Sequence, residues 1–269
     1  MTELLDTGLL LLLLLGASLF GLLMQPLLAE RYRSRETVEL IQLVVTMLVT
    51  FAALVLGLLT TSVKASFDTI SNDMRGYATD IIQLDRLLTE YGNGADPIRQ
   101  ELRSYTAAAI ATTWVGEPQP TGIDYPKFPP RLPTDATLES SGLGGMLAHI
   151  ELRIRMLPAS DSMHQRLVAD SLNQLSALLQ HRWKLIEEAH ASISMPFYLV
   201  LIFWLVIVFA SFGLSSPRNT LAGTVILLGA LSIASAIFVI LELDTPFVGL
   251  ITISSQPMRD ALAHLAQPP

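Results

Sequence analysis

The chain has 269 residues, of which 51% are hydrophobic and 15% are charged, with a formal net charge of −7 and no cysteine. The charged fraction is low for a soluble protein of this size, and the negative net charge argues against nucleic acid as a partner. The lack of cysteine excludes disulfides, thiol catalysis and cysteine-ligated metals.

Four apolar runs are each long enough to cross a bilayer, which takes about 20 residues of helix. Between their end residues they contain no Lys, Arg, Asp or Glu, and they lie at roughly 8–28, 39–63, 196–214 and 220–241. A charge at mid-bilayer is costly, so these runs indicate membrane spans. The first run lacks the basic start of a secretory signal and is expected to be retained.

The predicted fold is an all-α membrane protein, with four transmembrane helices in two pairs that flank a helical extramembrane domain. The pairs fall in 1–63 and 195–244, and the domain falls in 64–194. The remaining segment, 245–269, is expected to contain a short amphipathic helix after Pro257, with Met258, Leu262 and Leu265 on one side.

The second run carries a stripe of small and polar residues along one helix face. Between Glu39 and Lys64 at its ends, the stripe consists of Gln42, Thr46, Thr50, Ala53, Gly57 and Thr61. The opposite face is expected to hold Val44, Leu48, Val55, Leu58 and Leu59. Two interpretations compete: small and hydroxyl residues allow close helix packing in lipid, or the stripe lines a pore.

The extramembrane region is predicted to be helical. A heptad-like seam continues from the second span to Gly92 and Gly94, and it consists of Phe67, Ile70, Met74, Tyr77, Ile81, Leu84, Leu88 and Tyr91. Further helices are expected at 96–115, with Asp96 as N-cap, and at 145–157. Between them, 116–137 is rich in proline and predicts an irregular loop.

A last long helix of the domain is expected to begin at Ser160 or Asp161 and to lead into the third span. Its predicted apolar stripe consists of Val168, Leu172, Leu175, Leu179, Trp183, Ile186 and Ile193. The second and third spans would thus each continue into the domain as a long helix.

The side of the membrane that carries the domain is left open by the sequence. Arg31, Arg33 and Arg35 lie in the first short loop and Arg218 lies in the second, which favours a cytoplasmic position for both loops. That position would place both termini and the domain on the outer face.

Charged residues mark the span ends on the domain side, namely Lys64, Asp68, Glu242 and Asp244. An ion pair between Lys64 and either Glu242 or Asp244 is topologically possible. The alternative is separate residues in the headgroup zone, since exposed pairs contribute little.

No motif indicates an enzyme. The five histidines have no metal-ligand spacing, and Gly142–Gly145 lacks the remainder of a phosphate loop. No nucleophile and base stand at a recognisable spacing. We therefore expect no catalytic residues, no cofactor and no metal site.

Several segments together resemble one family, the bacterial bestrophin-like proteins, formerly a domain of unknown function. These segments are Lys64–Asp68, Ile82–Leu88, Leu102–Tyr105, Ser216–Asn219, Leu241–Phe247 and Ser255–Leu262. The family is similar at a distance to bestrophins, which are pentameric, ligand-gated ion channels with four spans and a cytosolic helical domain, and whose second span lines the pore neck. This cytosolic placement opposes the loop-charge argument.

The resemblance implies a homo-oligomeric channel with five copies, as in bestrophins. The channel would pass small inorganic ions through a pore lined by the second span. Bestrophin necks are ringed by bulky apolar residues, whereas this stripe is small and hydroxylic, and the acidic calcium clasp of animal bestrophins is missing. The alternative function is a non-conducting membrane interaction or scaffold protein. Expected partners are the lipid bilayer, further copies of the chain and small ions, in the inner membrane of a bacterium.

Overall fold

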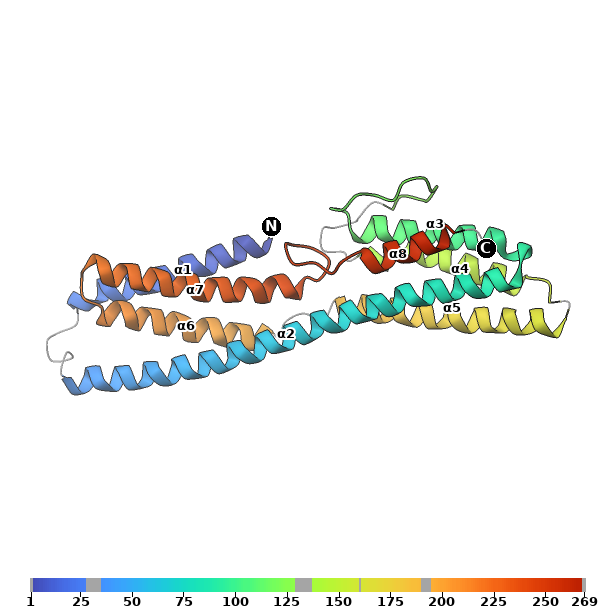
Figure 1. Ribbon diagram of the computed structural model, residues 1–269. Coiled ribbons are helices and arrows are strands. Elements are labelled where there is room, and N and C mark those ends of the chain that lie inside the picture. The colour runs from blue at the N-terminus through green and yellow to red at the C-terminus, as the bar shows by residue number, and fades with distance from the viewer. Residues whose placement is uncertain (1, 28–34, 129–136, 160, 190–194, 268–269) are drawn as a thin grey trace. The chain divides into compact units, whose positions relative to one another are not determined.

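The computed structural model describes residues 2–27, 35–128, 137–159, 161–189 and 195–267 (Figure 1). All regular elements in these ranges are helical. The longer helices are α1 (Thr2–Met24), α2 (Arg35–Tyr91), α3 (Asp96–Thr113), α4 (Ser141–Arg155), α5 (Ser162–Ala189), α6 (Met195–Ser215), α7 (Thr220–Asp244) and α8 (Gln256–Leu265). Short 3-10 turns are η1 (Gln25–Leu27), η3 (Asn93–Ala95) and η4 (Thr137–Glu139).

Four of these helices, α1, α2, α6 and α7, are long and apolar enough to cross a membrane. This confirms the predicted fold class of an all-α membrane protein with four spans. Arg31, Arg33, Ser160 and Ile193 lie outside the described residues.

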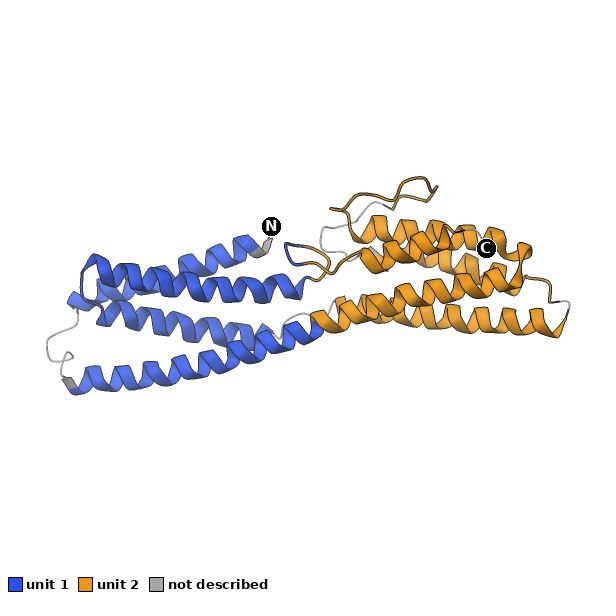
Figure 2. Ribbon diagram, viewed as in Figure 1, with its two compact units in different colours: residues 1–66, 192–245, 249–251 blue, residues 67–191, 246–248, 252–269 orange. Residues whose placement is uncertain are grey.

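The chain divides into two compact units, coloured separately in Figure 2. Unit 1 comprises residues 1–66, 192–245 and 249–251, and unit 2 comprises 67–191, 246–248 and 252–269. Helix α2 contributes its first part to unit 1 and its second part to unit 2. The continuity of α2 up to Tyr91 confirms the predicted long helix, and Gly92, with a φ of 96°, follows its end.

Unit 1 has its own apolar core, formed where α1, α2, α6 and α7 meet. Its most deeply buried members are Leu10, Leu14, Leu201, Phe209, Ala230, Ile237 and Ile240. In α7 the small residues Ala230 and Ala234 are 0% and 3% exposed, so this part of the helix packs closely against its neighbours.

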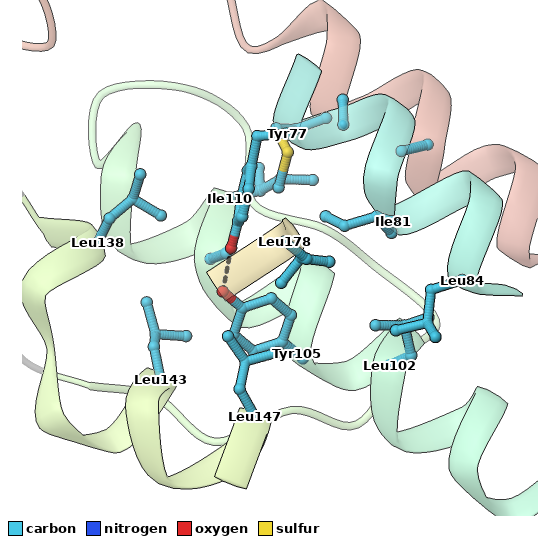
Figure 3. Packing of buried hydrophobic residues seen from close by; sticks show 14 of the residues in the cluster. Tyr77, Ile81, Leu84, Leu102, Tyr105, Ile110, Leu138, Leu143, Leu147 and Leu178 are labelled. Carbon is cyan, nitrogen blue, oxygen red and sulfur yellow. Dashed lines mark hydrogen bonds between the residues drawn. The ribbon is translucent and has the colours of Figure 1, made fainter. Parts of the chain in front are cut away.

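The core of unit 2 is built on the predicted seam of α2. Ile70, Met74, Tyr77, Ile81, Leu84 and Leu88 are all buried, and Phe67 and Tyr91 are partly buried, so the seam prediction is confirmed. In the middle of this core the hydroxyl groups of Tyr77 in α2 and Tyr105 in α3 form a hydrogen bond to one another (Figure 3). Each hydroxyl therefore satisfies the other inside an otherwise apolar environment.

Helix α5 turns most of its predicted stripe to the core of unit 2, where Leu175 and Ile186 are buried and Val168, Leu172 and Leu179 are partly buried. Its buried residues include Leu178, Arg182 and Leu185, whereas Trp183 is 60% exposed. The stripe prediction was therefore wrong at Trp183. The physical reason is that Arg182, which is 3% exposed, occupies a core position and donates hydrogen bonds to the carbonyl oxygens of Leu138 and Ser140.

Two predicted helix starts also need correction. Asp96 is the first residue of α3 and Ala95 is its N-cap, because the turn η3 leads directly into the helix. Helix α4 begins at Ser141 and not at residue 145. Gly142, Gly144 and Gly145 thus lie inside the helix, and the Arg182 guanidinium lies 3.7 Å from where a Cβ of Gly144 would be.

Helix α8 was expected as an amphipathic helix, and it packs its apolar side into the core of unit 2. Met258 and Leu265 are buried and Leu262 is partly buried, as predicted. Arg259 fixes the start of the helix by donating to the Glu117 carboxylate at 3.0 Å and to the carbonyl oxygen of Pro118 at 2.8 Å.

Candidate functional site

The part of α2 in unit 1 packs through one face only. Ala52, Leu59 and Val63 are 5%, 8% and 5% exposed and belong to the unit 1 core. The opposite face was predicted to include Val44 and Leu58, but these are 47% and 62% exposed. The packing face therefore shares Leu59 with the face expected opposite the stripe, but Val44 and Leu58 of that face are not part of it.

The candidate stripe lies away from this packing face. Every member is exposed in the single chain, namely Gln42, Thr46, Thr50, Ala53, Gly57 and Thr61. At Gly57, no atom of the described residues outside its own stretch of helix backbone lies within 4 Å of the position that a Cβ would take. The stripe is therefore not packed against the other helices of its own chain.

The threonine hydroxyls of the stripe are bonded within α2 itself. The hydroxyl of Thr46 donates to the carbonyl oxygen of Gln42 at 2.8 Å, that of Thr50 to Thr46 at 2.9 Å, and that of Thr61 to Gly57 at 2.8 Å. This is the usual way in which a hydroxyl is satisfied on a membrane helix. Each oxygen keeps acceptor capacity toward whatever lies beside the stripe.

A third face of α2 is bulky and apolar. It lies roughly a quarter turn around the helix from the stripe, at 3.6 residues per turn. Its exposed members are Leu40, Leu43, Met47, Phe51, Leu54 and Leu58. The helix thus separates small polar side chains from large apolar ones among the surfaces that its own chain leaves uncovered.

The charged span ends differ in their surroundings. Glu39, Lys64 and Asp68 are exposed and Asp244 is half-buried. Glu242 is only 2% exposed. The proposed pairing of Lys64 with Glu242 or Asp244 stays a prediction.

Glu242 anchors the loop that follows α7. Its carboxylate accepts hydrogen bonds from the backbone N–H groups of Leu250 at 2.6 Å and Ile251 at 3.2 Å. Gly249 has a φ of 122°, and a Cβ there would overlap the Glu242 carboxylate. Backbone donors of this kind satisfy a buried carboxylate, a role that sequence spacing did not reveal.

Unit 2 contains two half-buried polar clusters that sequence analysis missed. Asp80 accepts a hydrogen bond from Gln174 at 3.0 Å and is paired with His181. Asp73 accepts from Lys184 at 3.0 Å. Each pair joins α2 to α5, so these side chains connect two helices of the unit.

The second cluster also includes Glu188. The Lys184 ammonium lies 3.7 Å from the Glu188 carboxylate. Burial, followed by the adjacent carboxyl of Asp73, raises the pKa of Glu188. The hydrogen bond to Asp73 raises the pKa of Lys184.

Across the described ranges, His, Cys, Asp and Glu form no group of three or more suited to a metal ion.

A family model named for the bestrophin-like domain matches residues 11–258, which is most of the chain. The chain belongs to the bestrophin-like family. No curated protein sequence matches this bestrophin-like chain. Membership of this family agrees with the four helices that are long and apolar enough to cross a membrane, α1, α2, α6 and α7.

Crystal structures of a bacterial bestrophin homolog from Klebsiella pneumoniae have a similar fold. A variant with a Trp-to-Ala substitution is 16% identical, with a TM-score of 0.65 over 99% of this bestrophin-like chain and 99% of that chain. A structure of the homolog solved by Zn-SAD phasing is also 16% identical, with a TM-score of 0.63 over 97% and 99% of the two chains. At this identity the likeness establishes the fold.

Proposed function

We propose that the chain assembles into a homo-oligomeric membrane channel that passes small ions through a pore lined by the stripe of α2. The observation that carries the proposal is the exposure of the whole stripe, from Gln42 to Thr61, in the single chain. Membership of the bestrophin-like family supports it, because bestrophins are ion channels. The fold shared with bacterial bestrophin homologs is consistent with it.

The three faces of α2 support an arrangement of copies around an axis. The face through Ala52, Leu59 and Val63 packs within the chain. The apolar face through Leu43, Leu54 and Leu58 is suited to neighbouring copies or lipid acyl chains. The small polar stripe then remains for a water-filled passage.

The chemistry of the stripe suits passive conduction of ions. Its side chains are uncharged, and its hydroxyl and amide oxygens can replace part of an ion's hydration shell without holding the ion tightly. No ring of basic residues lies along it, so the stripe gives no sign of anion selection. An acidic residue, Glu39, stands at one end and a basic residue, Lys64, stands at the other.

The oligomer belongs to the proposal because one α2 cannot enclose a passage. Cyclic symmetry would bring one stripe from each copy to the axis, and the family resemblance favours five copies. The expected surroundings are the inner membrane of a bacterium, with lipid on the outer surface of the assembly. The proposal assigns no enzymatic role to the chain.

Current measurement with matched glycine variants tests the proposal. Purified protein in a planar bilayer should conduct, and Gly57→Leu should reduce the current at least about tenfold by narrowing the passage. Because nothing lies within 4 Å of a Cβ at Gly57, the substitution should leave the fold of the protomer unchanged.

Gly16→Leu is the matched control, since Gly16 in α1 is equally open and exposed. The control should keep the wild-type current. A wild-type protein without current in any salt, or a monomer by native mass measurement, would overturn the proposal. If Gly57→Leu instead dissociates the oligomer, the stripe is a packing surface and the chain is a membrane interaction protein.

A further inference from the structure

Unit 1 contains a groove with a volume of about 400 Å³ between α1, α6 and α7. Its walls are apolar and include Leu9, Leu13 and Ile202. Its mouth carries two carboxylates, from Asp6 and Asp244. The volume falls within the range of small-molecule sites, roughly 300–1,000 Å³.

The groove follows the direction of the spans. Asp6 is in the second turn of α1, Met195 begins α6 and Asp244 ends α7, so these residues lie where the spans reach the headgroup layer. Leu13 is seven residues beyond Asp6 and Ile202 is seven beyond Met195, which places them about 10 Å deeper at 1.5 Å per residue. A ligand of this groove therefore has a polar end at headgroup depth and an apolar end among the acyl chains.

The outer wall of the groove faces away from the unit 1 core. Leu9, Leu13 and Met195 are 68%, 46% and 64% exposed, while Leu10 at the base is 4% exposed. The groove is thus accessible from the bilayer side and closed on the protein side. An occupant can enter from the membrane without any opening of the helix bundle.

The charge at the mouth selects the headgroup. The described lining holds Asp6, Asp244 and the hydroxyl-bearing Tyr198, with no Lys or Arg among its members. A primary ammonium has three N–H donors, so it can bond to two carboxylates and a hydroxyl oxygen together. Hydrogen bonds between an ammonium and carboxylates are charge-assisted and strong.

We propose that this groove binds a membrane lipid whose headgroup ends in a primary ammonium. The ammonium lies between Asp6 and Asp244 near the Tyr198 hydroxyl, and one acyl chain lies along Leu9, Leu13 and Ile202. The phosphate stays in the headgroup layer outside the groove. The site is separate from the α2 stripe and does not depend on conduction.

Lipid retention by the full chain tests the proposal. Detergent-purified protein is mixed with phosphatidylethanolamine or with phosphatidylcholine of identical acyl chains, and bound lipid is counted by native mass spectrometry. The two lipids have the same net charge, but phosphatidylcholine has no N–H donor. We expect phosphatidylethanolamine to be retained with a preference of about tenfold, equivalent to one decade in dissociation constant.

Two kinds of variant separate charge from shape. The double variant Asp6→Asn with Asp244→Asn should lose the preference, while the control Glu36→Gln, an exposed acid in α2 that does not line the groove, should keep it. Leu13→Trp fills the groove, keeps both carboxylates and should reduce retention of phosphatidylethanolamine. It keeps the test decisive if the double variant fails to fold.

The proposal is overturned if wild type retains both lipids equally, or if a folded double variant keeps the preference. It is also overturned if Leu13→Trp leaves retention unchanged. If the variants change the number of copies in the assembly without changing lipid retention, a second copy of the chain and not a lipid covers the groove. None of these readouts depends on whether the protein conducts.

Discussion

Gly213 of α6 lies directly against the backbone of Ser18 in α1, so that a Cβ at residue 213 would overlap the Ser18 carbonyl oxygen. The contact is reciprocal, because a Cβ at Gly21 of α1 would overlap the carbonyl oxygen of Ala210 in α6. Two helices can approach this closely only where both lack side chains. The pair of glycines therefore sets the distance between α1 and α6 in unit 1.

We expect Gly213→Ala and Gly21→Ala to destabilise unit 1, because the added methyl group meets backbone and not a movable side chain. Overpacking of this kind costs typically about 1–3 kcal/mol. Gly16→Ala on α1 is the matched control, since nothing lies near a Cβ there. It should be neutral or stabilising by roughly 0.5–1 kcal/mol through helix propensity.

Thermal unfolding in detergent, followed by size-exclusion chromatography, measures both effects. The two close-contact variants should unfold at lower temperature than wild type and the control should not. Equal melting temperatures for Gly213→Ala and Gly16→Ala would show that the two helices can separate without cost.

The seam of α2 in unit 2 could be predicted because its aliphatic and aromatic residues recur at helical spacing from Ile70 to Leu88, and all of them are buried. The burial of Arg182 in α5 could not be predicted in the same way. Arg182 is buried there because carbonyl oxygens of Leu138 and Ser140 accept its hydrogen bonds. Periodicity assigns a charged residue to the surface unless such partners are known.

The candidate stripe of α2 shows the same contrast between what helix periodicity predicts and what tertiary packing decides. Its alignment from Gln42 to Thr61 follows from helix periodicity, but the true packing face depended on which neighbours cover Ala52 and Leu59. The Asp80–His181 pair joins residues 101 positions apart. No local pattern predicts a contact over that separation, because tertiary packing alone creates it.

A buried ion pair joins α2 to α3 in unit 2. Arg99 Nε lies 2.8 Å from Asp85 Oδ1, with the two side chains 13% and 4% exposed. Arg99→Ala would leave a buried carboxylate without its partner, which costs about 3–5 kcal/mol. We expect a corresponding loss in the free energy of unfolding, measured by chemical denaturation.

The exposed pair Arg86 and Glu90 on the same helix supplies the control, with side chains 79% and 47% exposed. Arg86→Ala should cost about 0.5 kcal/mol or less. The double variant Asp85→Leu with Arg99→Met should recover much of the loss, because neither charge then remains buried. A loss for Arg99→Ala no larger than that for Arg86→Ala would contradict the interpretation.

The Tyr77–Tyr105 hydrogen bond predicts a non-additive double-mutant cycle (Figure 3). Tyr105→Phe leaves the buried Tyr77 hydroxyl without its partner, at a cost of about 1–3 kcal/mol. Replacing both tyrosines by phenylalanine removes the unsatisfied group, so the double variant should lose less than the sum of the single variants. Strict additivity in urea unfolding would exclude the coupling.

The same pair sets an alkaline limit on stability. Burial raises the pKa of Tyr105 from 10.0 to about 12. The folded state therefore holds this proton more tightly than the unfolded state does, and the associated stability is lost as pH rises through that interval. We expect the urea midpoint of wild type to fall over this interval more steeply than that of the double phenylalanine variant.

Glu188 predicts a pH dependence at the acidic end. Burial and the neighbouring Asp73 carboxyl raise its pKa, although Lys184 acts in the opposite direction. The folded state thus favours the protonated acid, so its contribution to stability is full below the ordinary pKa of glutamate. It is lost as pH rises through the raised pKa.

Glu188→Gln keeps a neutral side chain of the same shape at every pH. We therefore expect the variant to match wild type in acid and to become the more stable protein as pH rises, as measured by melting temperature in a pH series. Glu187→Gln, at the exposed neighbouring position, serves as the control and should follow wild type throughout. If Glu188→Gln ran parallel to wild type across the series, the pKa of Glu188 would be the same in the folded and unfolded states, which would contradict the prediction and mean that Lys184 cancels the effect of burial.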